Sequence, residues 1–289
     1  IRSTFYRLAM LTGNGLIVIL GGYLELKYGD KTKAWSHTMV IIGALMTSIT
    51  IYNFFTTPKA ESTDAYKAAE TEDKPSFGKV FSTFFQKKQI GLILAFILLF
   101  RLGEAQLLKM LNPFLMDPID KGGLGLSTES IGLIYGTFGI IALVIGGILG
   151  GISISKSGLK KWMLPMVLAM RIPIFGFVLL AHFQPESQIY IYLTIILEQF
   201  GYGFGFAAFM MYLIYVAEGE FKTSHYSIAT GFMALGMMLP GMISGYIQEY
   251  LGYENFFIWI IISTIPGLIL SQYLIYPKEF GKKEIQENK

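Results

Sequence analysis

The sequence contains no cysteine and only three histidines among its 289 residues. The absence of cysteine excludes disulfide bonds, thiolate metal sites and cysteine nucleophiles. The histidines, His37, His182 and His225, are far apart and form neither an HxxxH nor an HExxH pattern. We therefore expect no metal site and no cofactor.

Charged residues are also scarce, at 15% of the chain, whereas hydrophobic residues make up 53%. The mean hydropathy of +0.52 is typical of a membrane protein and not of a soluble domain. The 23 phenylalanines and 17 tyrosines fit aromatic belts at membrane interfaces, and the 32 glycines fit closely packed membrane helices. A soluble globular domain is therefore not expected.

Eight continuous apolar segments each have about the 20 residues that a bilayer crossing needs. They span residues 4–25, 35–57, 90–117, 127–153, 162–183, 189–217, 227–250 and 256–276. The sequence predicts an all-α, polytopic transmembrane bundle with about eight membrane helices.

Lysine placement predicts the orientation of this bundle. Most lysines lie in one set of connections and in the C-terminal tail, whereas the opposite set carries Lys27, Lys31, Lys33 and Lys121. The lysine-rich side is expected to be cytoplasmic, which places both ends of the chain there.

The long polar connection at residues 58–89 divides the chain. Its first part is charged, poor in large apolar residues and predicted to be a flexible linker. Its second part follows a candidate N-cap at Ser76. An apolar stripe then runs through Phe77, Val80, Phe81, Phe84 and Phe85, which predicts an amphipathic helix. This helix either lies on the cytoplasmic interface or packs on the bundle.

The linker suggests a domain organisation with two spans before it and six after it. Residues 1–57 would be the last two helices of an N-terminal six-helix half, and residues 90–276 a C-terminal six-helix half, followed by a cytoplasmic tail at 277–289. Because six plus six is a familiar transporter plan, we expect four further helices outside this sequence.

The segment at residues 90–117 carries charges inside a membrane span. As one continuous helix, it would place Arg101, Glu104 and Asn112 on one face, with Lys109 to one side. Arg101 and Glu104 have the spacing of a helical side-chain pair. The group is either a structural ion pair between helices or the lining of a solute or proton path.

Two later spans contain one charge each, Arg171 and Glu198. The near-balance of buried cations and anions predicts that these charges compensate one another, in a static or a working network. Glu198 has no adjacent base in the sequence, so we expect it to carry a proton. Glu104, beside Arg101, is expected to stay ionised.

Further polar and small residues lie within the spans. Asn14, Gln199, Tyr202 and Asn112 are candidates to meet a sugar or amide ligand, although packing roles are more common for such residues. The glycine runs, at Gly201, Gly203 and Gly205 and at Gly241 and Gly245, indicate close helix packing, with a hinge as the alternative.

A short connection resembles the loop signature of the major facilitator superfamily, G-x-x-x-D-R/K-x-G-x-R/K-R/K. The matching positions are Gly151, Lys156, Gly158, Lys160 and Lys161. Ser155 stands where the family usually has Asp, which weakens a charge-relay role for this loop. The resemblance implies that the spans are helices five to twelve of a twelve-helix transporter.

Four segments are similar to the AmpG muropeptide permeases and their acetyl-CoA-transporter relatives. They lie at residues 4–25, 100–106 (FRLGEAQ), 197–209 (LEQFGYGFGFAAF) and 222–246. Gln199 stands where Asn is common, Pro240 and Gly241 reverse the usual order, and Arg171 has no counterpart in the pattern. The resemblance implies proton-driven import of anhydromuramyl sugar-peptides across a bacterial inner membrane.

The expected function is therefore a proton-coupled, monomeric solute carrier that works by alternating access and binds no nucleic acid. The alternatives are another major facilitator carrier, for a sugar or an acetyl-CoA-like solute, and a non-transporting membrane receptor or scaffold. A membrane enzyme is disfavoured because the sequence has no metal cluster, activated nucleophile or phosphate loop.

Overall fold

The computed structural model describes residues 11–56 and 76–283, and every regular element in these two ranges is a helix. In chain order the elements are η1 (Leu11–Ile17), α2 (Val18–Tyr28), α3 (Lys31–Thr56), α5 (Phe77–Phe85), α6 (Ile90–Phe100), α7 (Leu102–Met116), η2 (Ile119–Lys121), α8 (Thr128–Leu133), η3 (Ile134–Gly139), α9 (Ile140–Ser157), α10 (Leu159–Arg171), α11 (Ile174–Phe183), α12 (Gln188–Ala217) and α13 (Lys222–Tyr273). The flexible linker predicted after residue 57 lies outside the described ranges.

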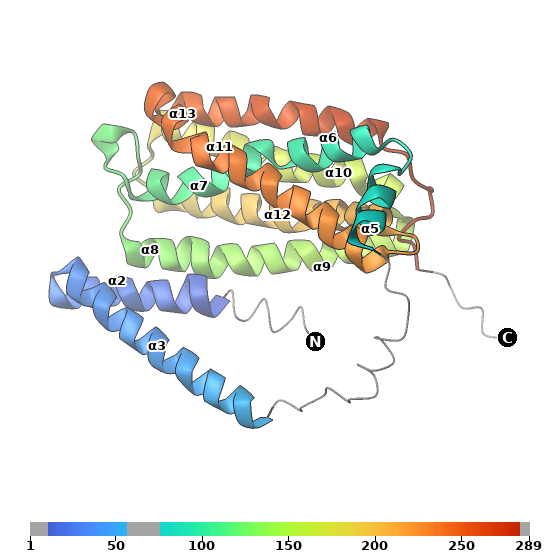
Figure 1. Ribbon diagram of the computed structural model, residues 1–289. Helices are drawn as coiled ribbons and strands as arrows, with labels where there is room; N and C mark the ends of the chain where they lie inside the picture. Colours follow the sequence, from blue (N-terminus) through green and yellow to red (C-terminus); the bar gives the residue numbers. More distant parts are fainter. Residues whose placement is uncertain (1–10, 57–75, 284–289) are drawn as a thin grey trace.

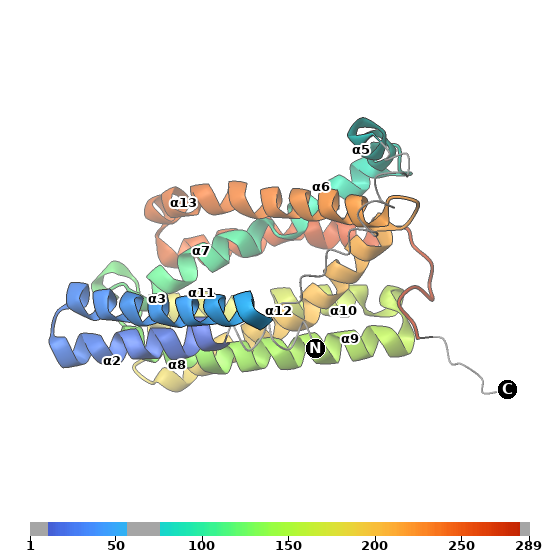
Figure 2. The same cartoon turned by 60° about the horizontal axis from the view of Figure 1, so that its bottom comes forward.

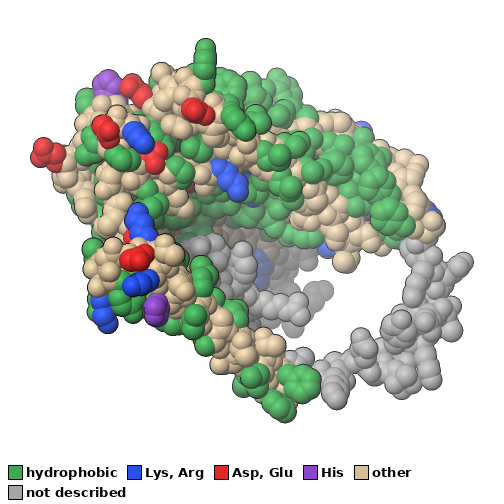
Figure 3. Space-filling view, turned by 60° about the vertical axis from the view of Figure 1, so that its left-hand side comes forward, with side chains coloured by type: hydrophobic (Ala, Val, Ile, Leu, Met, Phe, Trp, Pro, Cys, Tyr) green, Lys and Arg blue, Asp and Glu red, His purple; other side chains and the backbone are tan. Residues whose placement is uncertain are grey.

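The long helices run side by side, so the chain reversals gather at two ends of the molecule (Figure 1). One end carries the α2–α3 and α7–α8 turns and the bend of α13. The other end carries α5 and the α9–α10 and α12–α13 turns (Figures 1 and 2). Charged side chains gather at the first end, and apolar side chains cover much of the flanks (Figure 3). This distribution suits a bundle that crosses a membrane.

Six helical stretches of the described chain are long and apolar enough to cross a membrane. One of them, α13, has 52 residues and is interrupted at Gly252, whose φ of 72° and ψ of 165° are not helical. It therefore consists of two crossings that meet at a bend, and this bend lies within the connection that the sequence predicted at residues 251–255. The described part of the first predicted crossing is η1 followed by α2. The predicted helical membrane fold is confirmed.

Two crossings are broken near their middle. The crossing that was expected to be one helix over 90–117 is interrupted at Arg101, where φ is −98° and ψ is 5°. The crossing predicted at residues 162–183 is interrupted between α10, which ends at Arg171, and α11, which begins at Ile174. Pro173 lies in this break and has no N–H to continue the helical hydrogen bonding. Broken membrane helices expose main-chain groups inside the bundle, and transporters use such ends to bind charged groups.

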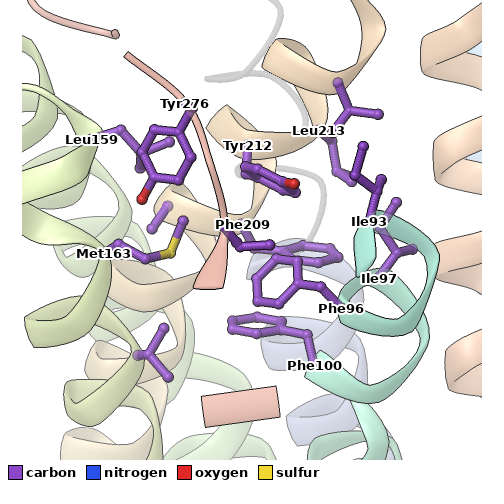
Figure 4. Packing of buried hydrophobic residues seen from close by; sticks show 14 of the residues in the cluster. Ile93, Phe96, Ile97, Phe100, Leu159, Met163, Phe209, Tyr212, Leu213 and Tyr276 are labelled. Carbon is purple, nitrogen blue, oxygen red and sulfur yellow. The ribbon is translucent and has the colours of Figure 1, made fainter. Parts of the chain in front are cut away.

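An aromatic cluster fills the bundle on the α5 side of these breaks. Phe96, Phe100 and Phe209 form a run of rings, with Tyr212 and Tyr276 above it (Figure 4). The Phe100 and Phe209 rings are parallel within 2° and lie 4.6 Å apart. This packing fixes the end of α6 against α12.

Glycines allow α12 to approach its neighbours closely. A Cβ atom at Gly201 or Gly203 would collide with a main-chain carbonyl of α10 or α9, and one at Gly205 would lie 2.5 Å from the Met166 carbonyl oxygen. The predicted packing role of these three glycines is therefore confirmed. Among the described residues no atom lies within 4 Å of a Cβ built at Gly245, so the predicted packing face of Gly241 and Gly245 is not seen at that position.

Helix α5 lies across one end of the bundle (Figure 2). Val80 and Phe84 are buried, and Phe77 is 79% exposed. Among the described residues the Ser76 side chain makes no capping hydrogen bond, so the predicted cap is wrong. Its main-chain carbonyl instead accepts from the N–H of Lys79 at 2.9 Å. The helix packs on the bundle through one side only, and its place on the membrane interface stays a prediction.

Candidate functional site

The break between α6 and α7 carries a buried ion pair. Arg101 Nη2 lies 2.7 Å from Glu104 Oε1, and both side chains are 3% exposed. Glu104 is in the first turn of α7, where the positive end of the helix stabilises a carboxylate. Arg101 also donates to the Tyr202 hydroxyl at 2.8 Å and lies over the Phe206 ring at 4.9 Å. The pairing expected from the sequence is present, and its functional role stays a prediction.

Arg171 contacts the other side of the same break. Its Nη2 donates to the carbonyl oxygen of Phe100, and the guanidinium lies over the Phe100 ring at 5.0 Å. Phe100 is the last residue of α6, so this carbonyl is at the negative end of that helix. Arg171 therefore caps α6. Its direct hydrogen-bond partner is a main-chain carbonyl, and Glu104 lies within electrostatic range of Arg171. The predicted mutual compensation of the buried charges stays a prediction.

Glu198 lies within the uninterrupted helix α12 and is 2% exposed. Its Oε2 accepts a hydrogen bond of 2.7 Å from the Gln199 side-chain amide. Gln199 also interacts with the side chain of Tyr135, which belongs to the π-helical segment η3. Glu104 lies within electrostatic range of Glu198. The partner of Glu198 is thus a neutral amide, in contrast to the cationic partner of Glu104.

The structure separates the other candidates from this buried group. Lys109 and Asn112 are exposed, whereas Arg101 and Glu104 are buried. Glu104, Lys109 and Asn112 keep their predicted spacing because all three lie in the continuous helix α7, and Arg101 lies at the break before it. Their place on a solute or proton path stays a prediction. The Asn14 side chain lies outside the described part of the chain.

A cavity of about 550 Å³ with a mixed apolar and polar lining lies between the α2–α3 pair and the crossings formed by α7, α8 and η3. Its polar lining comprises Glu25, Lys31, Trp35, Asn112, Thr128 and Tyr135. Asn112 and Tyr135 bring the body of the bundle to this cavity, and Tyr135 connects it with the Gln199–Glu198 pair. The side chains of Tyr135 and Gln199 therefore lie between the cavity and the buried carboxylate of Glu198.

The sequence reasoning missed several cavity residues. Glu25 accepts hydrogen bonds from Trp35 Nε1 at 2.6 Å and from Thr128 Oγ1 at 3.1 Å, which ties α2 to α3 and α8. Glu25 could have been noticed as an acidic residue at the end of an apolar span. Tyr135 gave no comparable signal, because the chain has 17 tyrosines and Tyr135 lies inside an apolar segment without a charged neighbour.

The predicted loop signature forms a tight turn between two helices. Gly151, Ser155 and Lys156 lie in α9, Gly158 has a positive φ of 82°, and Lys160 and Lys161 begin α10. The segment after α13 binds this turn. Lys160 Nζ donates to the Leu274 carbonyl at 3.1 Å, and the N–H of Lys283 donates to the Ser155 carbonyl at 2.8 Å. The conformation suits a structural role in holding the chain end.

Comparison with known families agrees with this architecture. The family profile described as Major Facilitator Superfamily matches residues 2–217 and, in an overlapping match, residues 105–289. The chain belongs to the major facilitator superfamily. It is therefore a multi-pass membrane protein of a family that consists of transporters rather than enzymes.

The chain also resembles individual proteins along most of its length. It is 28% identical over 273 residues to the putative transporter AmpG 4 of Rickettsia felis, covering 93% of this chain and 62% of the relative. It is 24% identical over 266 residues to the anhydromuropeptide permease of Escherichia coli K12, covering 92% of this chain and 50% of the relative. The chain thus spans about half to three fifths of the length of these relatives.

Proposed function

We propose that this protein is a proton-coupled secondary transporter that imports anhydromuropeptide or a related amino-sugar oligosaccharide by alternating access. One observation carries the proposal. Two carboxylates, Glu104 and Glu198, are buried inside membrane-crossing helices, and Glu198 is linked to the cavity. A charge within a membrane span costs at least about 2.5 kcal/mol, and such residues usually mark solute or proton paths.

The cavity suits a polar, partly apolar solute. Its volume of about 550 Å³ falls within the usual size of small-molecule sites. Trp35 and Tyr135 supply amphipathic rings, and Asn112 and Thr128 supply amide and hydroxyl groups. Sugars bind through this combination of ring faces and hydrogen bonds. The name of the Escherichia coli relative, an anhydromuropeptide permease, supports the same solute class.

The two buried carboxylates would have different tasks. Glu104 holds Arg101, and the guanidinium of Arg101 is suited to bidentate contact with a solute carboxylate. Arg101 Nε is buried and makes no hydrogen bond among the described residues, so one edge of the guanidinium lacks a partner. Glu198, which bonds to an amide, would bind and release the proton. Lys109 and Asn112 would contact the solute on its way along α7.

We place the protein in a bacterial inner membrane, and the lysine distribution supports an orientation with both ends of the chain in the cytoplasm. Helix α5 and the segment after α13 lie at the same end of the molecule, as this orientation requires (Figure 1). The rocking of the α2–α3 side against the six-crossing body would open the cavity alternately to either face of the membrane.

Solute uptake into vesicles that carry the intact protein tests the proposal. Labelled anhydromuropeptide, a simple disaccharide and acetyl-CoA would be compared with and without an inward proton gradient. We expect gradient-dependent accumulation of anhydromuropeptide above the other two solutes. The proposal would be contradicted if none of the three solutes accumulated, or if their accumulation did not depend on the proton gradient.

A further inference from the structure

We infer that Tyr135 and Gln199 couple the occupancy of the cavity to the protonation of Glu198. The inference rests on the proposed function, because it supplies the link between the solute and the proton. Tyr135 lines the cavity, its side chain interacts with Gln199, and Gln199 donates a hydrogen bond to Glu198. The three residues form a continuous chain from the cavity wall to the buried carboxylate.

The local fold places Tyr135 between two packed surfaces. On one side, η3 is pressed against α12, and a Cβ atom at Gly139 would lie 3.2 Å from Cγ of Gln199. On the other side, η3 meets η1, and a Cβ atom at Gly15 would lie 2.8 Å from the Gly136 carbonyl oxygen. Both η1 and η3 are π-helical, a geometry that occurs often at functional sites. Tyr135 is therefore held where the α2–α3 pair meets the six-crossing body.

The chemistry of the three groups gives the coupling a sign. The Gln199 amide donates an N–H to Glu198, and a donor at a carboxylate favours its ionised form. The Tyr135 oxygen can accept the second N–H of the amide and so hold the amide in this orientation. A hydroxyl or amide group of a solute in the cavity would compete for the Tyr135 hydroxyl. Gln199 would then be free to turn away, and Glu198 would lose its donor.

The charges around Glu198 act in the same direction. The charged and titratable groups that interact with Glu198 in the described chain are Glu104 and Tyr135. Glu104 stays paired with Arg101, so its negative charge opposes a second negative charge nearby. Arg171 is engaged with the Phe100 carbonyl. Once the amide donor is withdrawn, the protonated form of Glu198 is therefore favoured.

This sign is the one that a symporter needs. Solute binding promotes proton binding at Glu198, and by linkage a bound proton promotes solute binding by the same factor. Return of the amide to the carboxylate then favours release of the proton after the solute has left. The solute group that contacts Tyr135 is a neutral hydroxyl or amide, which are the groups that amino sugars carry.

The number of protons taken up per solute transported tests this link. Intact protein would be reconstituted with a pH-sensitive dye inside the vesicles, and labelled anhydromuropeptide would be the probe. Tyr135→Phe keeps the ring and removes the hydroxyl. We expect the proton-to-solute ratio to fall roughly tenfold or more, and solute exchange to fall only about fivefold, as for one lost hydrogen bond. A purely structural role would lower both rates together and leave the ratio unchanged.

Two further variants complete the test. Gln199→Leu should lower the same ratio, and it decides the matter if Tyr135→Phe does not fold. Tyr192→Phe is the matched control, because Tyr192 contacts Phe138 of η3 at 5.9 Å and should keep the unaltered ratio. If the unaltered protein moves no protons with the probe, the proposed function fails and the inference fails with it. If it does, but Tyr135→Phe and Gln199→Leu keep its ratio, only the inference is overturned.

Discussion

The two buried carboxylates of this protein, Glu104 and Glu198, have opposite surroundings. Glu104 lies in the first turn of α7, and its carboxylate accepts a hydrogen bond of 2.7 Å from the guanidinium of Arg101. Glu198 lies inside an unbroken helix and accepts from the neutral amide of Gln199, also at 2.7 Å. The distances are equal, so the difference lies in the charge of the partner and in the state of the helix.

This difference separates a group that holds the structure from one that can change its charge. Neutralising the Glu104 carboxylate would leave the buried Arg101 cation without an anion, which lowers the stability of the folded protein. A neutral Glu198 leaves behind only a neutral amide, which can rotate to find another partner. Glu104, at the helix break, is therefore expected to keep its charge. Glu198, whose partner is an amide, is a candidate for proton exchange.

The largest effect on stability is expected for Glu104→Gln. It leaves the buried Arg101 unpaired, and the loss of one partner of a buried ion pair costs about 3–5 kcal/mol. Thermal unfolding in detergent would measure the loss. The exchanged pair Arg101→Glu/Glu104→Arg should recover only part of it, because the positive end of α7 then faces a cation. A Glu104→Gln protein as stable as the unaltered one would remove the distinction between the two carboxylates.

A smaller loss of about 1–3 kcal/mol is expected for Arg171→Met, since the Phe100 carbonyl would lose its buried donor. Arg171→Lys, which keeps a cation at the end of α6, should retain part of this stability. The same unfolding assay applies to both. Equal unfolding temperatures for the methionine and lysine variants would show that the helix end does not depend on the charge.

The smallest effect is expected for Lys109→Gln. Lys109 belongs to the same crossing as Arg101 and Glu104, but it is exposed, and such surface changes usually stay within about 0.5 kcal/mol. A loss as large as that of Glu104→Gln would mean that the buried network extends to Lys109.

Several features of the fold could be predicted from sequence because they depend on local composition. Apolar length predicts the crossings, the three-residue spacing of Arg101 and Glu104 predicts their pairing, and alternate glycines predict the tight packing of α12. The family resemblance follows from motifs that are short and continuous. The match of the family profile to most of the chain confirms it.

Other features depend on where the chain breaks and on which helices meet. Arg171 binds a carbonyl that is free only because α6 ends at Phe100, and no side-chain pattern shows such a partner. Tyr135 meets Gln199 only because η3 lies against α12. The cavity depends on the position of the α2–α3 pair, so neither Glu25 nor Trp35 could be placed in it from the sequence.

The most direct test of the account is the transport behaviour of Glu198→Gln in vesicles that contain the intact protein. Because glutamine can accept the Gln199 hydrogen bond but cannot exchange a proton, we expect proton-driven uptake of labelled anhydromuropeptide to be abolished. Counterflow exchange of the same solute, which needs no net proton movement, should continue. Driven uptake at the level of the unaltered protein would contradict the assignment of Glu198 as the proton carrier.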